Sequence, residues 1–337
     1  MVYRKFQSAC ENDYEEYYYR TKKNQKIMDN FSIAIHGGAG TLVKGTMTPD
    51  KEIAYKSTLQ KALDTAYDCL AQGGSSVDAV EKAVVFLENS TLFNAGKGSV
   101  FTAEGTHEMD AAIMEGATLR AGGVSLITGI KNPICLARDI MEKSEHVFLA
   151  GKGAMDFALS LDYTLKDASY FYDALRYEQW QQIKGTDSFQ LDHSTKKDSK
   201  FGTVGAVAKD RNGTISAATS TGGMTNKKFG RIGDSSIIGS GTYANNKTCA
   251  VSCTGSGEFF IRGVAAYDVS CLMEYKNYTL QQAADEVILK RMINLGGDGG
   301  LIAIAANGTI AMPFNTEGMY RGFKTSSGQE ATAIYKD

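Results

Sequence analysis

The pattern of apolar and polar residues in the N-terminal part of the chain predicts one strand and two helices. Residues 31–36 (FSIAIH) alternate and contain enough β-branched residues for a buried strand, which runs into the glycine cluster at 36–40 (HGGAG). A helical pattern then runs from Asp50 to Gly73, and Ser76 can cap a second helix. The apolar positions of the two helices are Ile53, Leu59, Ala62, Leu63, Ala66 and Leu70, followed by Val77, Val80, Val84 and Leu87.

The rest of the chain is patterned mainly as short strands. Residues 109–116 and 122–129 are strand-like, and a helical stretch follows at 134–141. Two Asn-Gly pairs join strand-like runs within 205–219 and 301–312, and each favours a hairpin because both residues tolerate positive φ. Residues 259–293 have a helical pattern. Helices before and between hairpins predict an α+β fold with largely antiparallel sheets and no evident β-α-β repeat.

Two segments lack the periodicity of a packed element. Residues 1–30 are charged and rich in tyrosine, which predicts a peripheral N-terminal extension. From 184 to 200 the only large apolar residues are Phe189 and Leu191, so an exposed linker is expected at about 184–202. A core-like strand at 201–207 follows it with no intervening turn.

Composition limits the classes of function. The 337 residues are 43% hydrophobic and 22% charged, which is typical of a globular protein, and the net charge of -2 provides no basic field for nucleic acid or anionic lipid. There are 36 glycines and three prolines, which suggests backbone packed closely against backbone or ligand. The six cysteines show no CxxC spacing, and no run of 18 apolar residues occurs. We therefore expect a cytoplasmic protein without a membrane or nucleic-acid partner.

Several common catalytic motifs are absent from the sequence. There is no GxxxxGK[ST], GxGxxG, GxSxG or HExxH. His107 and Asp110 could form half of a metal site, but two residues are not a ligand set. A histidine triad is equally unsupported, because His193 lies in the expected linker and His36 at a buried strand end.

What remains is a series of small hydroxyl residues that each adjoin glycine. Thr203 follows Gly202, Thr221 precedes two glycines, and Thr254 opens the run Thr-Gly-Ser-Gly. A further block, Gly-Arg-Ile-Gly-Asp, occupies 230–234. Taken singly, Thr203 could be a strand residue, Thr221 a turn residue, and Arg231 with Asp234 a surface ion pair.

Taken in order, these segments resemble the threonine-dependent N-terminal nucleophile (Ntn) hydrolases of the plant-type (type 2) L-asparaginase and isoaspartyl peptidase group. The resemblance covers about residues 31–323 and includes IAIHGGAGT, FNAGKGSVF, HEMDAAIMEG, GTVGAVAKD, STGGMTNKKFGRIGDS and CTGSGEFFIR. It implies a four-layer αββα sandwich with two central, mainly antiparallel sheets. It further implies one domain at 31–337 that cuts itself between Gly202 and Thr203, giving subunits 1–202 and 203–337 that assemble as (αβ)2.

The resemblance also implies the roles of individual residues. Cleavage frees the α-amine of Thr203, whose reference pKa of about 7.7–8.0 suits a general base, so one residue supplies nucleophile and base. Thr221 would tune the Thr203 hydroxyl, Arg231 would clamp the substrate α-carboxylate, and Asp234 would hold the α-ammonium. The other expected positions are Thr254 and the Gly255 N–H as the oxyanion hole, Gly233 and Gly257 at the substrate, and Asn94 near the nucleophile.

No cofactor is expected for catalysis, but the same resemblance implies a structural sodium ion. Its ligands would be backbone carbonyl oxygens, which leave little signature in side chains. They belong to Leu87, Glu88, Ser90, Phe93, Ala95 and Lys97.

The implied reaction is hydrolysis of a side-chain amide, converting L-asparagine or β-aspartyl dipeptides to L-aspartate. Glycosylasparaginases are an alternative, but they usually place aspartate before the threonine and Gly-Asn-Gly in the oxyanion loop, where this chain has Gly202 and Ser256. Ser256 also departs from the threonine or histidine that is more frequent there, which leaves the substrate range open. Threonine aspartases and a non-catalytic homologue acting as a binding module are further alternatives.

Overall fold

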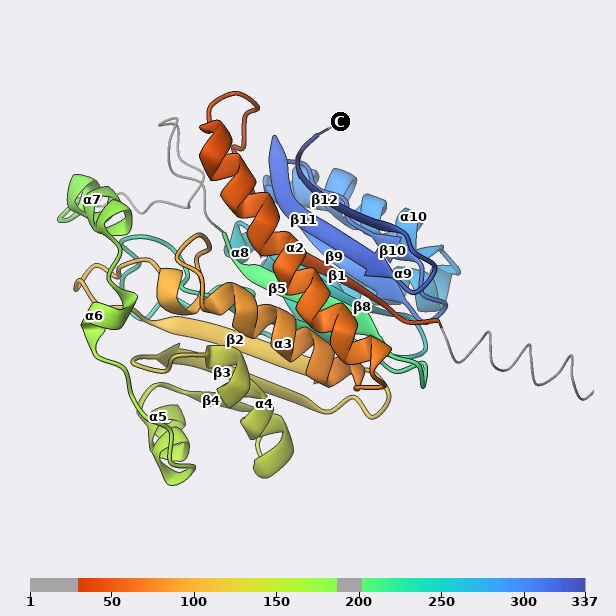
Figure 1. Ribbon diagram of the computed structural model, residues 1–337, viewed down its shortest axis with the longest axis horizontal. Helices are drawn as coiled ribbons and strands as arrows, with labels where there is room; N and C mark the ends of the chain where they lie inside the picture. The colour runs from red at the N-terminus through yellow and green to blue at the C-terminus, as the bar shows by residue number, and fades with distance from the viewer. Residues whose placement is uncertain (1–29, 187–201, 337) are drawn as a thin grey trace, which may run out of the picture.

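The computed structural model describes residues 30–186 and 202–336, which fold into four layers, helices on sheet on sheet on helices (Figure 1). The first sheet has the strand order β12-β11-β1-β5-β6-β2-β3-β4, and the second has the order β10-β9-β8-β7. The predicted αββα sandwich is therefore confirmed. The expected N-terminal extension, apart from Asn30, and residues 187–201 of the expected linker lie outside the described residues.

The strands of the first sheet are β1 (Ser32–Gly40), β2 (Met109–Glu115), β3 (Ala121–Ile127), β4 (Phe148–Ala150), β5 (Val204–Lys209), β6 (Ile215–Thr221), β11 (Gly318–Thr325) and β12 (Glu330–Tyr335). Those of the second are β7 (Thr242–Ala244), β8 (Cys249–Gly255), β9 (Gly299–Ala305) and β10 (Ile310–Ala311). The helices are α2 (Pro49–Ala71), α3 (Ser76–Glu88), η1 (Gly96–Gly98), α4 (Pro133–Lys143), α5 (Gly151–Ser160), α6 (Ala168–Phe171), α7 (Ala174–Ile183), α8 (Gly257–Gly263), α9 (Ala265–Lys276), α10 (Leu280–Glu286), η2 (Val287–Met292) and α11 (Ile293–Leu295).

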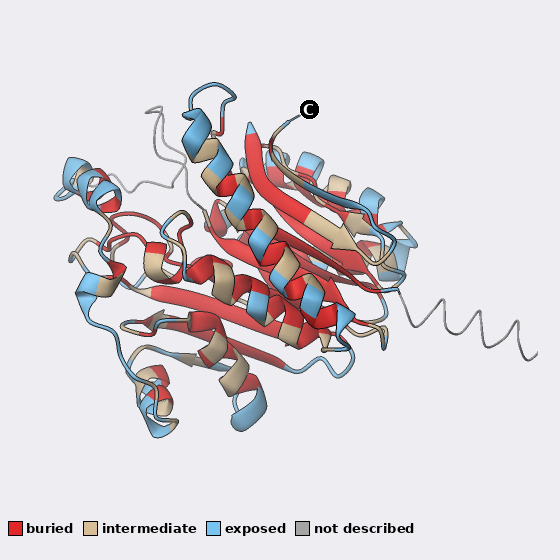
Figure 2. Cartoon of the chain, in the orientation of Figure 1, coloured by how far each residue is buried: buried red, intermediate tan, exposed pale blue. Residues whose placement is uncertain are grey.

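Alternation along the strands creates three apolar layers. In β1, Ile33 and Ile35 pack beneath α2 and α3, whereas Ala34 between them faces the second sheet. In β9, Ile302 faces the first sheet, and its neighbour Leu301 packs beneath the C-terminal helices. Figure 2 shows the consequence, since the central strands are buried while α2 and α3, which cover them, are exposed on their outer side. The inner strands of both sheets are thus buried on both faces, whereas the edge strands β4 and β12 of the first sheet are partly exposed.

Local signals fix the helices on the first sheet. Thr48 caps α2 by accepting from the Lys51 N–H, and Ser75 forms a capping box with Asp78 at the start of α3. The prediction that Ser76 caps this helix is wrong by one residue. The Ser76 N–H donates to Asp210, and the Ser76 hydroxyl pairs with Ser216 inside the core.

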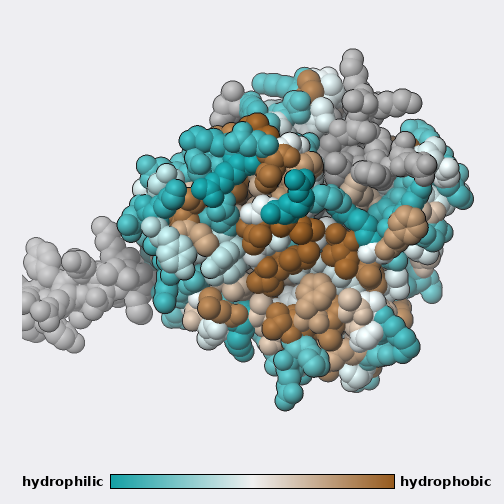
Figure 3. All heavy atoms as spheres, turned by 180° about the vertical axis from the view of Figure 1, so that it is seen from behind, coloured by the Kyte–Doolittle hydropathy of each residue, from teal (hydrophilic) through white to brown (hydrophobic). Residues whose placement is uncertain are grey.

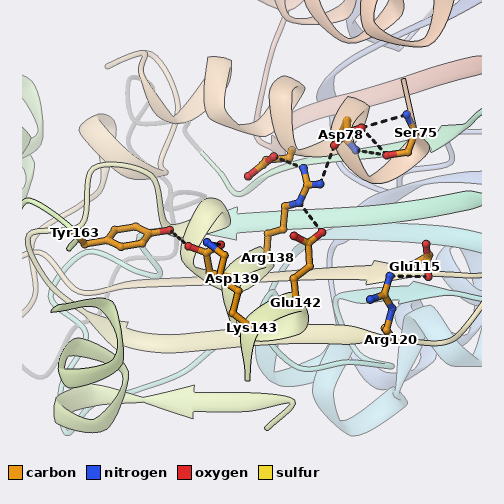
Figure 4. A network of polar contacts seen from close by, with 10 residues as sticks. Ser75, Asp78, Glu115, Arg120, Arg138, Asp139, Glu142, Lys143 and Tyr163 are labelled. Atoms are coloured by element: carbon orange, nitrogen blue, oxygen red, sulfur yellow. Dashed lines mark hydrogen bonds and ion pairs between the residues drawn. The ribbon is translucent and has the colours of Figure 1, made fainter. Parts of the chain in front are cut away.

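One arginine ties α4 to α3. The guanidinium of Arg138 binds Asp78 at 2.8 Å, Glu81 at 2.6 Å and Glu142 at 2.9 Å (Figure 4). Three carboxylates around one planar, permanently charged group fix the relative position of the two helices better than a single surface pair would. Helix α3 carries the loop that reaches the site described below.

Three expectations need correction. The helical stretch 259–293 is broken at Val264 and Asn277, both with positive φ (47° and 55°). β3 and β4 pair in parallel across α4, so one β-α-β unit does occur. The strand expected at 201–207 begins only at Val204, which leaves Gly202 and Thr203 outside the ladder.

None of the helices in residues 30–186 and 202–336 has both the length and the apolar character needed to cross a bilayer.

Candidate active site

Thr203 lies at one end of the layer between the two sheets, directly before β5. Its hydroxyl is buried and donates to the Thr221 hydroxyl at 3.1 Å. Thr221 ends β6, and its Oγ1 also accepts the Gly223 N–H at 3.0 Å. The second donor fixes the Thr221 oxygen as an acceptor for the Thr203 proton, which polarises the Thr203 hydroxyl.

The backbone before Thr203 lies against the glycine cluster of β1. A Cβ atom on Gly38, whose φ is +112°, would lie 2.6 Å from the Cα of Gly202, and one on Gly202 would lie 2.9 Å from the Cα of Gly38. Neither position has room for a side chain. The expected cleavage junction is therefore a close contact of two glycines.

Thr254 closes the site from the second sheet. It lies near the end of β8, and its Oγ1 accepts the Ala39 N–H at 3.3 Å. The same oxygen lies 3.3 Å from where a Cβ of Gly202 would be. The predicted oxyanion residue thus lies beside the predicted cleavage junction. Gly255, with a φ of +152°, turns the chain into α8.

A second cluster surrounds Arg231. Its Nε donates to Glu258 Oε1 at 2.8 Å and its Nη2 to Oε2 at 2.9 Å. A Cβ on Gly233 would lie 2.9 Å from Nη1, and one on Gly257 2.9 Å from Nη2 and 3.0 Å from Asp234 Oδ1. Both glycines leave space for the guanidinium. Four of the six residues predicted to bind substrate therefore lie together, and the other two are Thr254 and Gly255 of the oxyanion loop.

Asp234 is a buried carboxylate whose Oδ2 has no hydrogen-bond partner in the described part of the chain. Burial raises the pKa of Asp234 to about 7, and the nearby Arg231 only partly opposes this rise. The surface ion pair between these two residues, which the sequence left open, does not form, because the arginine fork is occupied by Glu258. A buried carboxylate with one oxygen that lacks a partner, packed close to Gly241 and Gly257, suits an incoming ammonium group.

Asn94 supports the site from behind. Its Nδ2 donates to the Gly223 carbonyl at 2.7 Å, its Oδ1 accepts the Val100 N–H at 3.1 Å, and its own carbonyl accepts the Gly222 N–H at 3.1 Å. These bonds hold the turn that carries Thr221. Asn94 therefore touches the turn behind the nucleophile, and no bond to Thr203 is among its contacts in the described structure.

In the loop expected to bind sodium, the carbonyl oxygens of Phe93, Ser90 and Thr91 lie near Gly98, and the first two belong to predicted ligands. A Cβ on Gly98 would overlap the Phe93 oxygen and lie 3.0 Å from the Ser90 oxygen, and one on Gly96 would lie 2.7 Å from the Glu88 Cβ. Backbone carbonyl oxygens are the kind of ligand that hard cations take, although the Phe93 oxygen also accepts the Ala95 N–H at 3.0 Å. The described residues contain no group of three or more His, Cys, Asp or Glu side chains that could hold a metal.

Two residues of the site went unrecognised in the sequence. Glu258 is the partner of Arg231, and its only signal is an acid directly after the glycine of the oxyanion loop. The sequence places His36 at a buried strand end and indicates no role for it, yet its Nδ1 lies 3.0 Å from the Thr203 carbonyl oxygen. Ser256, which departs from the related pattern, directs its hydroxyl to Asp298.

An αββα sandwich with a buried hydroxyl residue directly before a central strand has the architecture of the Ntn hydrolases. The sequence profile of the asparaginase family matches residues 29–334, and the chain belongs to this family.

Individual relatives cover nearly the whole chain. The isoaspartyl peptidase of Salmonella typhimurium is 45% identical over 313 residues, or 92% of this chain and 100% of that protein. The isoaspartyl peptidase of Escherichia coli is 46% identical over 308 residues, 90% of this chain and 96% of its own length. A probable isoaspartyl peptidase/L-asparaginase 2 of Arabidopsis thaliana is 40% identical over 330 residues, 92% of this chain and 100% of that protein.

Proposed function

We propose that this chain cuts itself between Gly202 and Thr203 and that the new N-terminal threonine hydrolyses L-asparagine and β-aspartyl dipeptides. The observation that carries the proposal is the bond from the Thr203 hydroxyl to Thr221, 3.1 Å long, at the glycine junction. Membership of the asparaginase family supports the reaction class, and the names of the relatives support the two substrates.

In the first step, Thr203 Oγ attacks the Gly202 carbonyl carbon. The hydroxyl proton leaves along its hydrogen bond to Thr221 Oγ1. The peptide C–N bond breaks, the Thr203 nitrogen takes up a proton as a free amine, and an ester remains. Water then opens this ester and leaves a carboxylate on Gly202. Nothing but water is consumed.

In turnover, Arg231 holds the substrate α-carboxylate and Asp234 its α-ammonium, which places the β-carbonyl carbon before Thr203. The α-amine takes the Thr203 proton, the hydroxyl oxygen attacks, and Thr254 with the Gly255 N–H stabilises the oxyanion. The amide C–N bond of the substrate then breaks. Ammonia or an amino acid leaves with the proton that the α-amine took from Thr203. Water hydrolyses the aspartyl ester by the same proton path, and L-aspartate is released.

Intact mass under denaturing conditions, with N-terminal sequencing of the smaller fragment, tests the first half of the proposal. We expect two fragments, the smaller beginning Thr203-Val204-Gly205. Release of aspartate from L-asparagine, β-aspartyl-leucine and an N-glycosylated asparagine tests the second half. Hydrolysis of the glycosylated substrate alone would identify a glycosylasparaginase, and an uncut chain inactive on all three would identify a binding module.

The sodium ion belongs to the same proposal. Its support is the cluster of carbonyl oxygens around Gly98. We expect the melting temperature to be higher in sodium chloride than in choline chloride at equal ionic strength. Gly98→Ala should abolish this difference by filling the cluster, whereas Gly153→Ala, in open space on α5, should retain it. A sodium effect of equal size in both variants would exclude this loop.

We also propose assembly as (αβ)2. Viewed from behind, apolar residues gather in the middle of one face of the molecule (Figure 3), and a contiguous patch of this kind often marks an interface. Large apolar side chains exposed between 264 and 295 are Val264, Tyr267, Tyr275, Leu289, Ile293 and Leu295. Light scattering after gel filtration tests the assembly, and a mass of one chain would contradict it. A cytoplasmic location stays a prediction.

A further inference from the structure

His36 stands in the middle of a buried chain of hydrogen bonds that the reaction above does not use. Its ring is fully buried, with Nδ1 3.0 Å from the Thr203 carbonyl oxygen and Nε2 2.9 Å from the Ser252 hydroxyl. Both nitrogens therefore have a partner. One is the carbonyl oxygen of Thr203, the proposed nucleophile, and the other is the hydroxyl of Ser252 in the second sheet.

The chemistry of the partners fixes where the proton lies. A carbonyl oxygen only accepts, so Nδ1 of His36 carries the hydrogen and donates to Thr203. Burial lowers the pKa of His36 to about 3, so the ring is neutral and Nε2 accepts. The Ser252 hydroxyl must then be the donor to Nε2.

The same reasoning extends the chain by two residues. Because the single Ser252 proton is used, Thr219 donates to Ser252 across 2.7 Å. Thr219 also lies 3.3 Å from the Gly241 carbonyl, but the shorter contact is the one to Ser252. Thr242 in turn donates to Thr219 across 2.6 Å, and its single proton is shared with the Ser235 carbonyl at 2.9 Å. The chain runs in one direction, from β7 through β6, β8 and β1 to the residue before β5, and joins the two sheets.

Gly205 supplies a second observation. A Cβ at this position would overlap both the Ser252 hydroxyl and Nε2 of His36. The second glycine of the Gly-Thr-Val-Gly motif thus makes room for this chain, two residues after the nucleophile.

The Thr203 carbonyl needs such a support. The ladder of β5 begins with the pair Val204 and Ser220, so Thr203 has no strand partner of its own. The proposed cut also removes the residue before it. The carbonyl bond to His36 and the hydroxyl bond to Thr221 then hold Thr203 at two points, which together fix the direction of its amine and its hydroxyl.

We propose that His36, held as the Nδ1–H tautomer by Ser252 and Thr219, is the positioning residue that fixes the N-terminal threonine for catalysis. The proposal rests on the proposed function, because it takes Thr203 as the nucleophile. Misplacing a reacting group by about 1 Å can cost about 10²-fold in rate, and such a loss falls on kcat and not on substrate binding.

Three substitutions separate positioning from space filling. The amide of His36→Asn can occupy the place of Nδ1 and donate to Thr203, whereas that of His36→Gln extends toward Ser252, and His36→Leu has no donor. With kcat expressed per chain that begins at Thr203, we expect the Asn variant to stay within about three-fold of the wild type and the Gln and Leu variants to fall about 10- to 100-fold. KM should change less than about two-fold in all three.

A matched pair tests the remote part of the chain. Thr219→Val and Thr248→Val each remove a buried hydroxyl from a hydroxyl pair, and Thr248 pairs with Ser270 at 2.6 Å outside this chain of bonds. Only Thr219→Val should lower kcat, by about three-fold or more, since only Thr219 donates to Ser252. Equal losses would mean that the hydroxyls act through stability alone.

The tautomer itself is measurable without turnover. Imidazole nitrogen-15 shifts of His36, assigned with the His36→Asn variant, should show a protonated Nδ1 and an unprotonated Nε2. An Nε2–H tautomer, or equal kcat in the Asn and Gln variants, would overturn the proposal. A wild type that neither cuts itself nor hydrolyses either substrate would instead refute the proposed function and with it the positioning role, even if the Nδ1–H tautomer is found.

Discussion

Arg231 and Glu258 form a two-bond fork, 2.8 and 2.9 Å long, between residues 27 apart in the sequence. The fork uses Nε and Nη2 and leaves the Nη1 edge beside Gly233. The arginine is mostly buried, whereas half of the Glu258 side chain is exposed. The planar group is thus oriented before a substrate arrives, which reduces the entropy lost on binding a second carboxylate.

Arg231→Ala should leave self-cleavage intact and weaken substrate binding severely. Loss of a desolvated charge partner costs about 2–5 kcal/mol, so kcat/KM for L-asparagine should fall at least about 30-fold, mainly through KM. Arg231→Lys keeps the charge without the fork and should recover only part of the loss. Steady-state kinetics on fully cut protein provide the measurement, and an unchanged KM would remove Arg231 from the substrate site.

Thr203→Ala should abolish both cleavage and turnover, because it deletes the proposed nucleophile while Thr221 and the glycine junction remain. Thr203→Ser keeps a hydroxyl and should still cut itself, though more slowly. Mass spectrometry over several days gives the extent of cleavage. Asparagine hydrolysis by the alanine variant would assign the nucleophile elsewhere.

Asp234 should make substrate binding depend on pH. Its pKa is raised to about 7 by burial, so the carboxylate that binds the ammonium is increasingly protonated as the pH falls below 7. Affinity for L-aspartate, measured by calorimetry, should therefore fall about ten-fold per unit from pH 6.5 to 5. Asp234→Asn should bind more weakly at pH 8 and lose this dependence. The same acidic limb in the variant would assign it to another group.

Glu88 should make stability depend on pH. Burial raises the pKa of Glu88 to about 8, although Ser220, Asn132 and the Ile134 N–H donate to it. Because the folded pKa lies above the unfolded value, the stabilisation is full below about pH 4.5 and is lost as the pH rises through 8. Relative to Glu88→Gln, the free energy of unfolding of the parent protein should fall from pH 5 to 8, by at most about 3.5 kcal/mol.

Denaturant titration in the uncut Thr203→Ala background measures this fall on a single chain. Glu317→Gln, an exposed position, provides the matched control and should follow the parent curve. If the free energy of unfolding depended on pH in the same way for Glu88→Gln and Glu317→Gln, Glu88 would carry its charge in the folded state at little cost in stability.

The amphipathic helices and the hairpins with an Asn-Gly turn are elements that the sequence predicts. In α2, Leu59 and Leu63 recur on the covered side, and the Asn-Gly turns identify two hairpins. Strands β11 and β12 are not among the predicted strands. Gly318 and Gly322 weaken the strand pattern of β11, yet each is required, because a Cβ there would press against Leu42 or Leu63.

The site was predictable only where a contiguous motif carries it. Thr203, Thr221 and Arg231 each adjoin glycines in recognisable blocks, and family resemblance assigned their roles. Glu258 and His36 act across the fold, on partners 27 and 167 residues away, so no local pattern reveals them. The local sequence around a buried strand histidine is the same whether the side chain only fills space or donates to a carbonyl group.

The order of strands in the first sheet has a consequence for refolding. β1 precedes the proposed cut but lies between β11 and β5, which follow it, and β6 pairs with β2 across the same divide. The cut would therefore leave two interleaved fragments held by three ladders. Unfolding would stay a first-order event, whereas refolding would become bimolecular and depend on concentration. At low concentration, the lifetime of the cut protein would be set by its unfolding rate.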